Sequence, residues 1–552
     1  MSKFSFPCGC NFDMTNIKLA DGRPSIKFRA EVTKINMNCS KVWDMISAGN
    51  TKGVFQLESP LGQSLARKMK PRNIEHLSAL ISIMRPGVLE AIRDKKSVTM
   101  HYIDRKNGTE EVSYFHPALE NCLKTTYGEM VYQEQAMQIA RDIAGFTMQE
   151  ADELRKAIGK KLPEAMAKVK TKFLEGTTKL GIVTEEEAIQ IFDWIEKSQR
   201  YSFNKSHAVS YAYNGYLSAF AKAHFSRAFF TSYLRYSGEK QKPYIEIYQL
   251  GQNARIMSIE VCGPDLRNQY KHFKLFDKKI YFGLLDLKGI GDAVWNKILI
   301  ALDTVKKQLR KDVGDWTWME FLIFFAPKIN STAVAALINS GALTYMGMDR
   351  TEMNYEYNVY TQLSPKETRW VESFMVGGSN IRLHELLNMI IQLPASRASA
   401  CNTEKRKTIV QGLYNTLIHP TYKLKDSPEW LASIETSLMG IPITCTSVEA
   451  CDISAANCTC IDYIEGKHPK TIIIAAQVDS CHEIKVKNGK NAGQKMAFLK
   501  ISDITGTAEN IVVFSDVWDE VSNVVFEGNN LLLYGEKSKD GASLIVKRVW
   551  QI

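Results

Sequence analysis

The sequence has no long hydrophobic run and no regular arrangement of cysteines. No apolar segment approaches the roughly 20 residues of a membrane-spanning helix, and residues 1–8 lack the apolar segment of a secretory signal. The eleven cysteines are scattered and include no Cys-x-x-Cys pair. These absences argue against a membrane-spanning protein, a disulfide-stabilised secreted domain and a structural zinc site. We expect a cytoplasmic protein with mostly reduced thiols, and we predict no metal site among Cys451, Cys458, Cys460 and His468. Cys8, Cys10 and Cys39 are either free thiols or part of a metal site completed by a partner chain.

Net charge is also small for a chain of this length. A formal charge of +10 over 552 residues suits many soluble enzymes, so its local distribution is more informative. One acid, Glu164, accompanies seven basic residues in a short segment: Arg155, Lys156, Lys160, Lys161, Lys168, Lys170 and Lys172. Such a run forms either a solvated helix face or a surface that binds phosphate. Composition alone does not decide between these two alternatives.

A polar, aromatic segment at residues 201–207 follows the first part of this basic run by about forty residues. Asn204, Ser206 and His207 are able to face the sugar and base of a nucleotide, while the basic helix is able to grip a triphosphate. The two segments together point to nucleotide handling. The structural alternative is that Asn204 and Ser206 cap a helix over residues 208–217, and both roles can coexist.

The chain is long enough, and at 45% hydrophobic residues apolar enough, to form several domains. Helical periodicity dominates residues 51–240, which we expect to form one large helical domain. Thr184 precedes three glutamates and predicts a helix over residues 185–199, capped by the threonine. Residues 1–50 precede this domain as a separate segment, and residues 351–468, punctuated by prolines, are expected to connect it to the C-terminal domain.

Residues 241–350 contain a candidate helix-hairpin-helix region. Lys288, Gly289 and Gly291 lie in a Gly-x-Gly turn directly before a helical pattern, and residues 337–343 resemble the end of a second, degenerate copy. The glycines would let the backbone approach a ligand, and amides at the helix start would donate to a DNA phosphate. The alternative is a glycine turn that only packs two helices together.

The last domain, residues 469–552, shows the alternating pattern of short β-strands. Five such strands predict a small barrel of the oligonucleotide-binding type. The segment between the first two strands carries four lysines and no acid: Lys485, Lys487, Lys490 and Lys495. Such a loop either binds single-stranded DNA or is a solvated hairpin. The predicted fold class is therefore multidomain and mainly α, with a large helical domain, a tandem helix-hairpin-helix region and a five-stranded C-terminal barrel.

Six motifs occur in an order that resembles the bacterial replicative DNA polymerase III alpha-subunit family, the C family of DNA polymerases. The resemblance is strong over residues 50–350 and looser over residues 470–552, and it implies a fingers domain, tandem helix-hairpin-helix modules and a terminal barrel. Six motifs in one order are far more specific than any one of them. They lie at residues 53–59, 85–87, 102–108, 127–135, 154–161 and 203–208.

The resemblance implies that this chain binds an incoming dNTP. Arg155 and its neighbour would hold the triphosphate, with Lys160 and Lys161 adding positive potential. The family carries a second arginine where this chain has Lys156, which keeps the charge but loses the two-pronged guanidinium. Asn204, Ser206 and His207 correspond to the family's nucleotide-side loop, and His207 is the expected direct contact.

The resemblance also implies phosphoryl transfer with two Mg²⁺ ions held by palm aspartates. No Asp-x-Asp occurs in the first fifty residues, and residues 26–29 match the region of the family's third aspartate with Arg29 in its place. By this short match, Lys27 faces a phosphate. The sequence therefore assigns no catalytic residue and no metal ligand in this chain. Residues 1–50 are interpreted as a remnant of the palm.

Three hypotheses follow. The first is a DNA-templated DNA polymerase of the replication machinery, in which this chain supplies the fingers and DNA-binding modules and another chain carries the palm, as in a split polymerase of viral origin. The second is a noncatalytic DNA-binding or scaffolding protein derived from the same fold. The third, an unrelated nuclease or ligase, lacks a supporting motif. The expected partners are primer–template DNA, dNTPs and a palm-bearing chain, in a bacterial or infected-host cytoplasm and with no membrane. Residues 350–470 contain no clear sliding-clamp peptide, which leaves that partner open.

Overall fold

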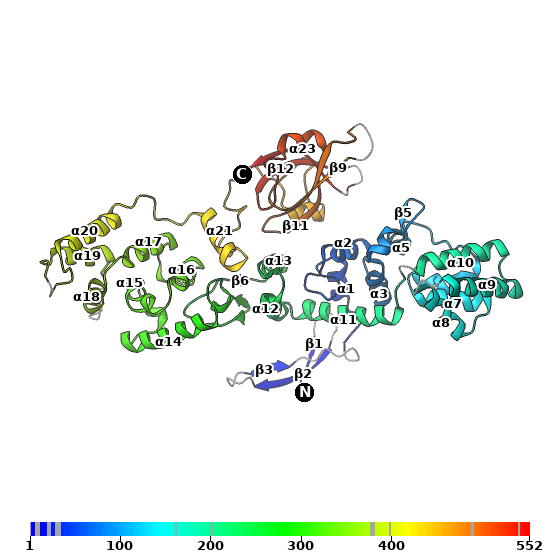
Figure 1. The fold of residues 1–552 in the computed structure, drawn as a ribbon, viewed down its shortest axis with the longest axis horizontal. Coiled ribbons are helices and arrows are strands. Elements are labelled where there is room, and N and C mark those ends of the chain that lie inside the picture. Colours follow the sequence, from blue (N-terminus) through cyan, green and yellow to red (C-terminus); the bar gives the residue numbers. More distant parts are fainter. Residues whose placement is uncertain are drawn as a thin grey trace. The chain divides into compact units, whose positions relative to one another are not determined.

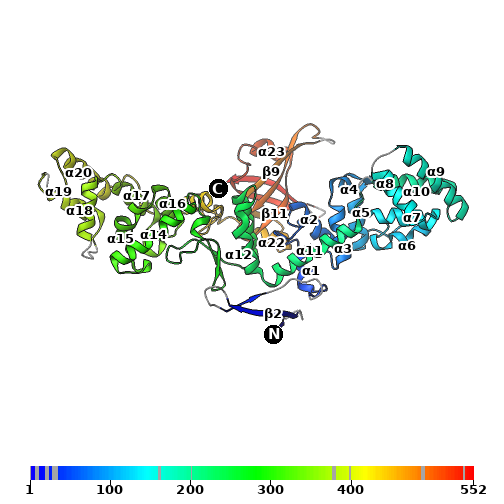
Figure 2. The ribbon, with the colours of Figure 1, turned by 60° about the horizontal axis from the view of Figure 1, so that its bottom comes forward.

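A computed structural model describes most of the chain, and it divides the protein into two compact units, Met1–Phe229 and Phe230–Ile552 (Figures 1 and 2). The description of residues 2–5, 11–18 and 24–27 covers the backbone alone. The remaining described segments are residues 35–159, 163–199, 202–375, 381–396, 399–486, 491–538, 541 and 543–552. No helix in these segments is long and apolar enough to cross a membrane.

The first unit begins with a small antiparallel sheet in the order β1-β2-β3, in which Ser2 pairs with Met14 and Thr15 pairs with Lys27. A two-stranded hairpin, β4-β5, follows later in the unit. The strands are β1 (Ser2–Ser5), β2 (Asn11–Lys18), β3 (Pro24–Lys27), β4 (Ile92–Arg93) and β5 (Lys96–Ser97).

Helices make up most of the first unit, as the periodicity predicts. They are α1 (Ser40–Ser47), α2 (Pro60–Met69), α3 (Ile74–Ile83), α4 (Pro86–Glu90), α5 (Val98–Asn107), α6 (Glu120–Leu123), α7 (Gln133–Ala144), α8 (Met148–Gly159), α9 (Pro163–Leu180), α10 (Glu185–Gln199) and α11 (Lys205–His224), followed by α12 (Ser226–Tyr236) at the boundary. The predicted helix over residues 185–199 is confirmed. Its cap is Thr184, whose hydroxyl accepts from the backbone N–H of Glu187 at 3.3 Å.

The helices of the first unit pack around two hydrophobic cores. One core joins α1, α3 and α11, with Trp43, Leu80 and Tyr216 at its centre. The other lies between α7, α8, α9 and α10 and contains Phe173 and Phe192. Figure 1 shows α11 as one long helix beside α1 and α3.

Helix α11 differs from the prediction at both ends. It begins at Lys205 and ends at His224, whereas the sequence indicated residues 208–217. Asn204 is the capping residue, because its side-chain oxygen accepts from the backbone N–H of His207 at 2.9 Å. Ser206 therefore lies in the first turn of the helix, and its expected role as a cap is wrong.

The second unit begins with helices and a small sheet in the order β6-β8-β7. The sheet strands are β6 (Val261–Cys262), β7 (Lys274–Phe276) and β8 (Lys279–Tyr281). The helices are α13 (Pro243–Ile256), α14 (Asp292–Leu309), α15 (Trp318–Glu320), α16 (Ser331–Asn339), α17 (Arg350–Tyr360), α18 (Pro365–Met375), α19 (Leu383–Gln392), α20 (Glu404–Ile418), α21 (Pro428–Met439), α22 (Cys460–Glu465) and α23 (Ser515–Val521).

The C-terminal strands close into a barrel in the order β10-β11-β13-β12-β9. All neighbours are antiparallel except β11 and β13. Alternate residues such as Ile474, Leu499 and Leu531 point into its core. The predicted fold class, mainly helical with a five-stranded C-terminal barrel, is confirmed. The barrel strands are β9 (Ile472–Lys485), β10 (Lys495–Ser502), β11 (Thr507–Val513), β12 (Asn530–Lys537) and β13 (Leu544–Gln551).

Candidate nucleotide and DNA interface

Helix α8 presents two of the predicted phosphate-binding side chains to solvent. Its apolar face, which includes Leu154 and Ala157, is buried in the core that α8 shares with α7, α9 and α10. Arg155 and Lys156 consequently lie on the outer face, with side chains 36% and 58% exposed. The helical periodicity thus places the residues that pack α8 into the core on one face and the residues available to bind a ligand on the other.

Asp152 pairs with both of these cations. Its Oδ1 atom accepts from Nε and Nη2 of Arg155 at 2.9 and 2.8 Å, and its Oδ2 atom lies 2.7 Å from Nζ of Lys156. Hydrogen bonds from Lys156 and Arg155 hold the pKa of Asp152 below its ordinary value. The carboxylate therefore keeps the two cations together on one helix face. A phosphate that binds there competes with Asp152.

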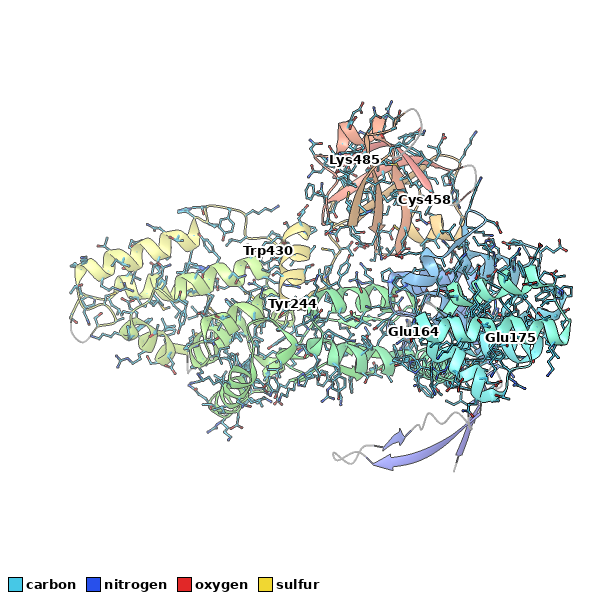
Figure 3. All side chains as sticks on the ribbon, turned by 45° about the vertical axis from the view of Figure 1, so that its right-hand side comes forward. Glu164, Glu175, Tyr244, Trp430, Cys458 and Lys485 are labelled. Carbon is cyan, nitrogen blue, oxygen red and sulfur yellow. The ribbon has the colours of Figure 1, made fainter. Side chains whose placement is uncertain are left out.

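The rest of the basic run contributes less free positive charge than its sequence suggests. Lys170 pairs with Asp193 of α10 at 2.8 Å, and Lys172 pairs with Glu150 of α8 at 2.5 Å. These contacts tie α9 to its neighbours; in Figure 3 the labels of Glu164 and Glu175 mark α9. Lys160 and Lys161 lie outside the described residues, and for Lys27 only the backbone position in β3 is described.

The turn at residues 203–207 is held against the start of α7. The backbone N–H of Phe203 donates to the Val131 carbonyl at 3.0 Å, and the Gln133 N–H donates to the Phe203 carbonyl at 2.9 Å. The side chains of Asn204, Ser206 and His207 are exposed. The predicted nucleotide-side residues are therefore together and accessible at the first turn of α11.

An aromatic row that the sequence reasoning did not predict extends from this turn. The ring of His207 lies 5.3 Å from that of Phe203 and 4.0 Å from that of Tyr211, measured between centroids. The Tyr211 ring lies 5.1 Å from Phe55, which is 40% exposed. The guanidinium of Arg85 lies 3.8 Å from the centre of the Phe203 ring. The sequence could have indicated Tyr211 as a member of this row, because it lies one helical turn after His207.

Phe55 belongs to a loop that is tied to α11 from several sides. Its backbone N–H donates to the Ser218 hydroxyl at 3.0 Å, and Nζ of the buried Lys222 donates to the carbonyls of Asn50 and Lys52 at 2.9 and 2.7 Å. Burial lowers the pKa of Lys222 to about 7. The next residue, Gln56, has a φ of +65°, a strained value for a side chain other than glycine. The motif at residues 53–59 thus holds Phe55 beside Tyr211.

Arg155 and His207 are not in direct contact. Within the described part of the chain, Arg155 pairs with Asp152, while His207 packs against Phe203 and Tyr211. Their use by one nucleotide stays a prediction.

The predicted hairpin precedes α14 in the second unit. Gly289 has a φ of +96°, so this position favours glycine, and a Cβ atom there would lie 3.0 Å from Thr332. Gly291 is the first flanking residue of α14 and, like Lys288, is exposed. A Cβ atom at Gly291 would meet nothing within 4 Å, residues 291–293 are exposed, and no side chain caps this helix start.

The second candidate copy, at residues 337–343, has a different environment. Gly341 is buried, and its N–H donates to the Ile338 carbonyl at 3.1 Å. The Ala342 N–H donates to the Leu337 carbonyl, also at 3.1 Å. This turn packs helices together, because the protein itself satisfies the amides that a phosphate would need.

The barrel carries the second predicted DNA-binding segment. Lys485 is exposed at the end of β9 (Figure 3), and Lys495 at the start of β10 pairs with Glu483 at 2.9 Å. Lys487 and Lys490 lie outside the described residues. Phe498 of β10 is 37% exposed and pairs in register with His482 of β9. An aromatic side chain therefore accompanies the basic strand ends.

The described residues do not form a metal centre. No three histidine, cysteine, aspartate or glutamate side chains in this part of the chain lie together as metal ligands. Cys39 is buried, with its sulfur 3.4 Å from Nε2 of His224. Cys8 and Cys10 lie outside the described residues.

Comparisons with known proteins agree with the motifs. Residues 14–181 match the bacterial DNA polymerase III alpha subunit finger domain. The chain is 30% identical over 517 residues to "DNA polymerase III subunit alpha" of Aquifex aeolicus, covering 92% of this chain and 39% of the relative. It is 31% identical over 530 residues to the Thermus aquaticus protein of the same name, covering 94% and 39%. Identity to the Escherichia coli K12 protein is 33% over 352 residues, covering 62% and 28%.

The chain thus spans about two fifths of the length of the first two relatives. The similarity includes the motif that carries Arg155 and Lys156, in the finger-domain match, and extends over nearly the whole chain in the longer alignments. The family that the six motifs predict is confirmed. Residues 14–181 match the finger domain of bacterial DNA polymerase III alpha subunits, and nearly the whole chain is similar to a part of those subunits.

Proposed function

We propose that this chain supplies the dNTP-binding fingers and the DNA-binding modules of a replicative DNA-templated DNA polymerase whose palm carboxylates lie on another chain. One observation carries the proposal: 92% of the chain aligns with a DNA polymerase III alpha subunit. The exposed cations of α8 and the exposed turn of α11 agree with it. The predicted domain boundaries, the cytoplasmic location and a viral origin of the split belong to the same proposal.

In this function Arg155 and Lys156 bind the triphosphate of the dNTP. Both are exposed and lie on one helix face, and Asp152 releases them as phosphate oxygens take over its hydrogen bonds. The Arg155 guanidinium provides two-pronged binding. Lys156 provides charge without that geometry. Lys27, Lys160 and Lys161 are proposed to add positive potential.

The turn of α11 binds the sugar and base. Ser206 and His207 are exposed, and the Phe203, Tyr211 and Phe55 rings continue the surface around His207. Aromatic faces suit a nucleobase and a sugar because they remove apolar surface from water. We assign His207 as the direct contact, with Asn204 shaping the turn.

Magnesium would supply activation of the primer hydroxyl and stabilisation of the leaving pyrophosphate when bound. The described residues do not fit such a site, since no three potential ligands lie together among them. Arg29, at the position we compare with the family's third aspartate, lies outside the described residues. We therefore derive no step through magnesium from this chain, and we assign its ligands to the palm partner.

DNA contacts are proposed for the α14 hairpin and the barrel. Lys288 and the backbone amides around Gly291 suit a duplex phosphate. Lys485, Lys487, Lys490 and Lys495, with Phe498 on the adjoining strand, suit a single strand by charge and stacking. These contacts position primer–template DNA without reading its sequence.

A noncatalytic scaffold derived from this family is the second candidate. Two substitutions favour it: Lys156 stands where the family has arginine, and Arg29 stands at the position that we compare with the family's third aspartate. Both functions use the same DNA contacts. They differ in whether a dNTP binds productively.

Primer extension with Mg²⁺ separates the two candidates. The chain is assayed alone and with a separately expressed palm-bearing chain, and we expect extension only in the mixture. Extension by this chain alone contradicts the assignment of the carboxylates to a partner. If neither the chain alone nor the mixture extends the primer, the scaffold is favoured.

The nucleotide site is tested in the active mixture with Arg155→Ala. We expect KM for dNTP to rise about tenfold or more, because a charge-assisted phosphate contact is lost. Lys168→Ala, an exposed lysine of the same basic run, is the matched control and should leave KM within about twofold. Equal KM values for Arg155→Ala and wild type reject the α8 site.

A further inference from the structure

Glu134 makes a hydrogen-bonded connection between the starts of two helices. It is the second residue of α7, yet its carboxylate contacts the beginning of α11. Its Oε1 atom accepts from Nδ2 of Asn204 at 2.8 Å. The backbone N–H of Lys205 donates to the same carboxylate, at 2.9 Å to Oε2 and 3.1 Å to Oε1. One partly buried carboxylate thus binds both the capping residue and the first residue of α11.

Backbone pairing places this carboxylate where it can act. Tyr132 and Phe203 form an isolated parallel bridge directly before α7 and α11. The two helices therefore begin side by side, although 70 residues of chain separate Glu134 from Asn204. Both helix starts attract negative charge, which stabilises Glu134 in this position.

The contact fixes the orientation of the Asn204 amide. An asparagine side chain has a donor end and an acceptor end. Glu134 accepts from the donor end, so the acceptor end, Oδ1, faces α11 and binds the N–H of His207 at 2.9 Å. Without the carboxylate the amide is free to rotate, and the cap at His207 loses its constraint. Glu134 therefore acts on His207 through Asn204.

This arrangement also decides where an anion cannot bind. Glu134 occupies the N–H of Lys205, and Asn204 occupies that of His207, so the start of α11 has fewer amides left for a phosphate. The negative charge of Glu134 repels a phosphate from the same point. The triphosphate is left to Arg155 and Lys156, while the turn presents Ser206 and His207 to the rest of the nucleotide.

We propose that Glu134 is a positioning residue of the dNTP site: through Asn204 it holds the first turn of α11 so that Ser206 and His207 face the sugar and base. The inference rests on the proposed function, because it assumes that this turn binds a dNTP. Glu134 itself touches neither the substrate nor a metal in this proposal. Its effect on nucleotide affinity should therefore depend on His207.

The test measures the affinity of the full chain for dATP bearing a fluorescent N-methylanthraniloyl group, together with thermal unfolding. We expect Glu134→Ala to weaken binding about tenfold and Glu134→Gln, which keeps one acceptor oxygen, to recover part of the loss. The matched control is Glu187→Ala. Glu187 binds the backbone N–H of Thr184 at 2.8 Å and so stabilises α10 in a similar way, away from the turn. The Glu187→Ala variant should lower the unfolding temperature and leave the affinity for the nucleotide nearly unchanged.

A double-mutant cycle separates positioning from a general loss of structure. In the His207→Ala background, Glu134→Ala should weaken nucleotide binding by less than about twofold, because the His207 side chain that Glu134 positions is already absent. Full additivity of the two changes overturns the proposal, as does unchanged affinity in Glu134→Ala.

Arg155→Ala distinguishes this failure from failure of the proposed function. Loss of affinity in Arg155→Ala with none in Glu134→Ala rejects Glu134 alone. The reverse pattern rejects the α8 phosphate site and supports Glu134. A wild-type chain that binds no nucleotide overturns both.

Discussion

Glu110 accepts hydrogen bonds from three basic side chains next to the motif at residues 102–108. Lys96 Nζ lies at 2.8 Å, Nδ1 of His101 at 2.8 Å and Nε of Arg105 at 2.7 Å. Arg105 also donates to the Tyr127 carbonyl at 3.2 Å. Two of the family motifs are thus joined by a charge network. These contacts stabilise the packing between the two motif segments.

This network predicts a pH dependence of stability. Burial by itself raises the pKa of Glu110, but hydrogen bonds from Lys96, His101 and Arg105 hold it at about 2, below the ordinary 4.5. Because the folded-state pKa is depressed, the stabilisation is fully present above pH 4.5 and is lost as pH falls toward about 2. We expect Glu110→Gln to lower the free energy of unfolding at pH 7 by about 1 kcal/mol, allowing for solvent screening.

Urea unfolding at pH 7 and pH 3 measures this effect. The difference between wild type and Glu110→Gln should shrink at pH 3. The neighbouring, exposed Glu111→Gln serves as control and should change stability little at either pH. A Glu110→Gln difference that is the same at both pH values contradicts the proposed charge network.

At the scale of elements, two glycine turns of the second unit look alike in sequence and serve different purposes. The turn before α14 is exposed, whereas Gly341 after α16 is packed against Arg350. Nη1 of Arg350 donates to Oε1 of the buried Glu435 at 2.7 Å. Glu435 also accepts from the backbone N–H of Thr444 at 2.8 Å. Gly341 thus makes room for a buried ion pair that joins α17 to α21.

We expect Gly341→Ala to destabilise the protein by about 3 kcal/mol, because the change combines an unfavourable positive φ with a collision. Its φ is +80°, and a Cβ atom would lie 2.5 Å from Nη2 of Arg350. Gly347→Ala is the matched control: its φ is +74°, but a Cβ atom there meets nothing within 4 Å. Equal decreases in the free energy of unfolding for the two variants, measured by denaturant unfolding, would show that crowding against Arg350 is unimportant.

At the scale of the whole molecule, the net charge of +10 is less informative than where unpaired cations remain. Lys170 and Lys172 are paired with acids, whereas Lys288 and Lys485 are exposed near the proposed DNA contacts. DNA binding through such side chains releases counterions from the phosphates. Affinity should therefore fall with salt, by about 0.9 log units per log unit of salt for each neutralised duplex phosphate.

Fluorescence anisotropy of a labelled primer–template at several salt concentrations measures this slope. Lys288→Ala should reduce the magnitude of the slope of log affinity against log salt concentration by about one. Lys279→Ala, whose lysine pairs with Glu260 at 2.8 Å, should change it less. A flat salt profile for the wild-type chain contradicts phosphate binding altogether.

The sequence by itself determined the features that depend on near neighbours along the chain. The helix over residues 185–199, with Thr184 as its cap, and the five barrel strands follow from periods and end signals that a few residues contain. Exposure of Arg155 and Lys156 follows from the same helical period. The family followed because its six motifs are long enough to be specific.

Only the tertiary structure decided which distant side chains meet. Glu134 contacts Asn204 across 70 residues, and Phe55 contacts Ser218 across 163. It also decided that Gly341 is a packing turn, since Arg350 fills the space beside it. Local propensity carries no information about such partners, because they are selected by packing and by the need to satisfy buried polar groups. The contact of Phe55 with Tyr211 and that of Glu134 with Asn204 therefore became visible only once the Phe55 loop and α7 were placed beside α11.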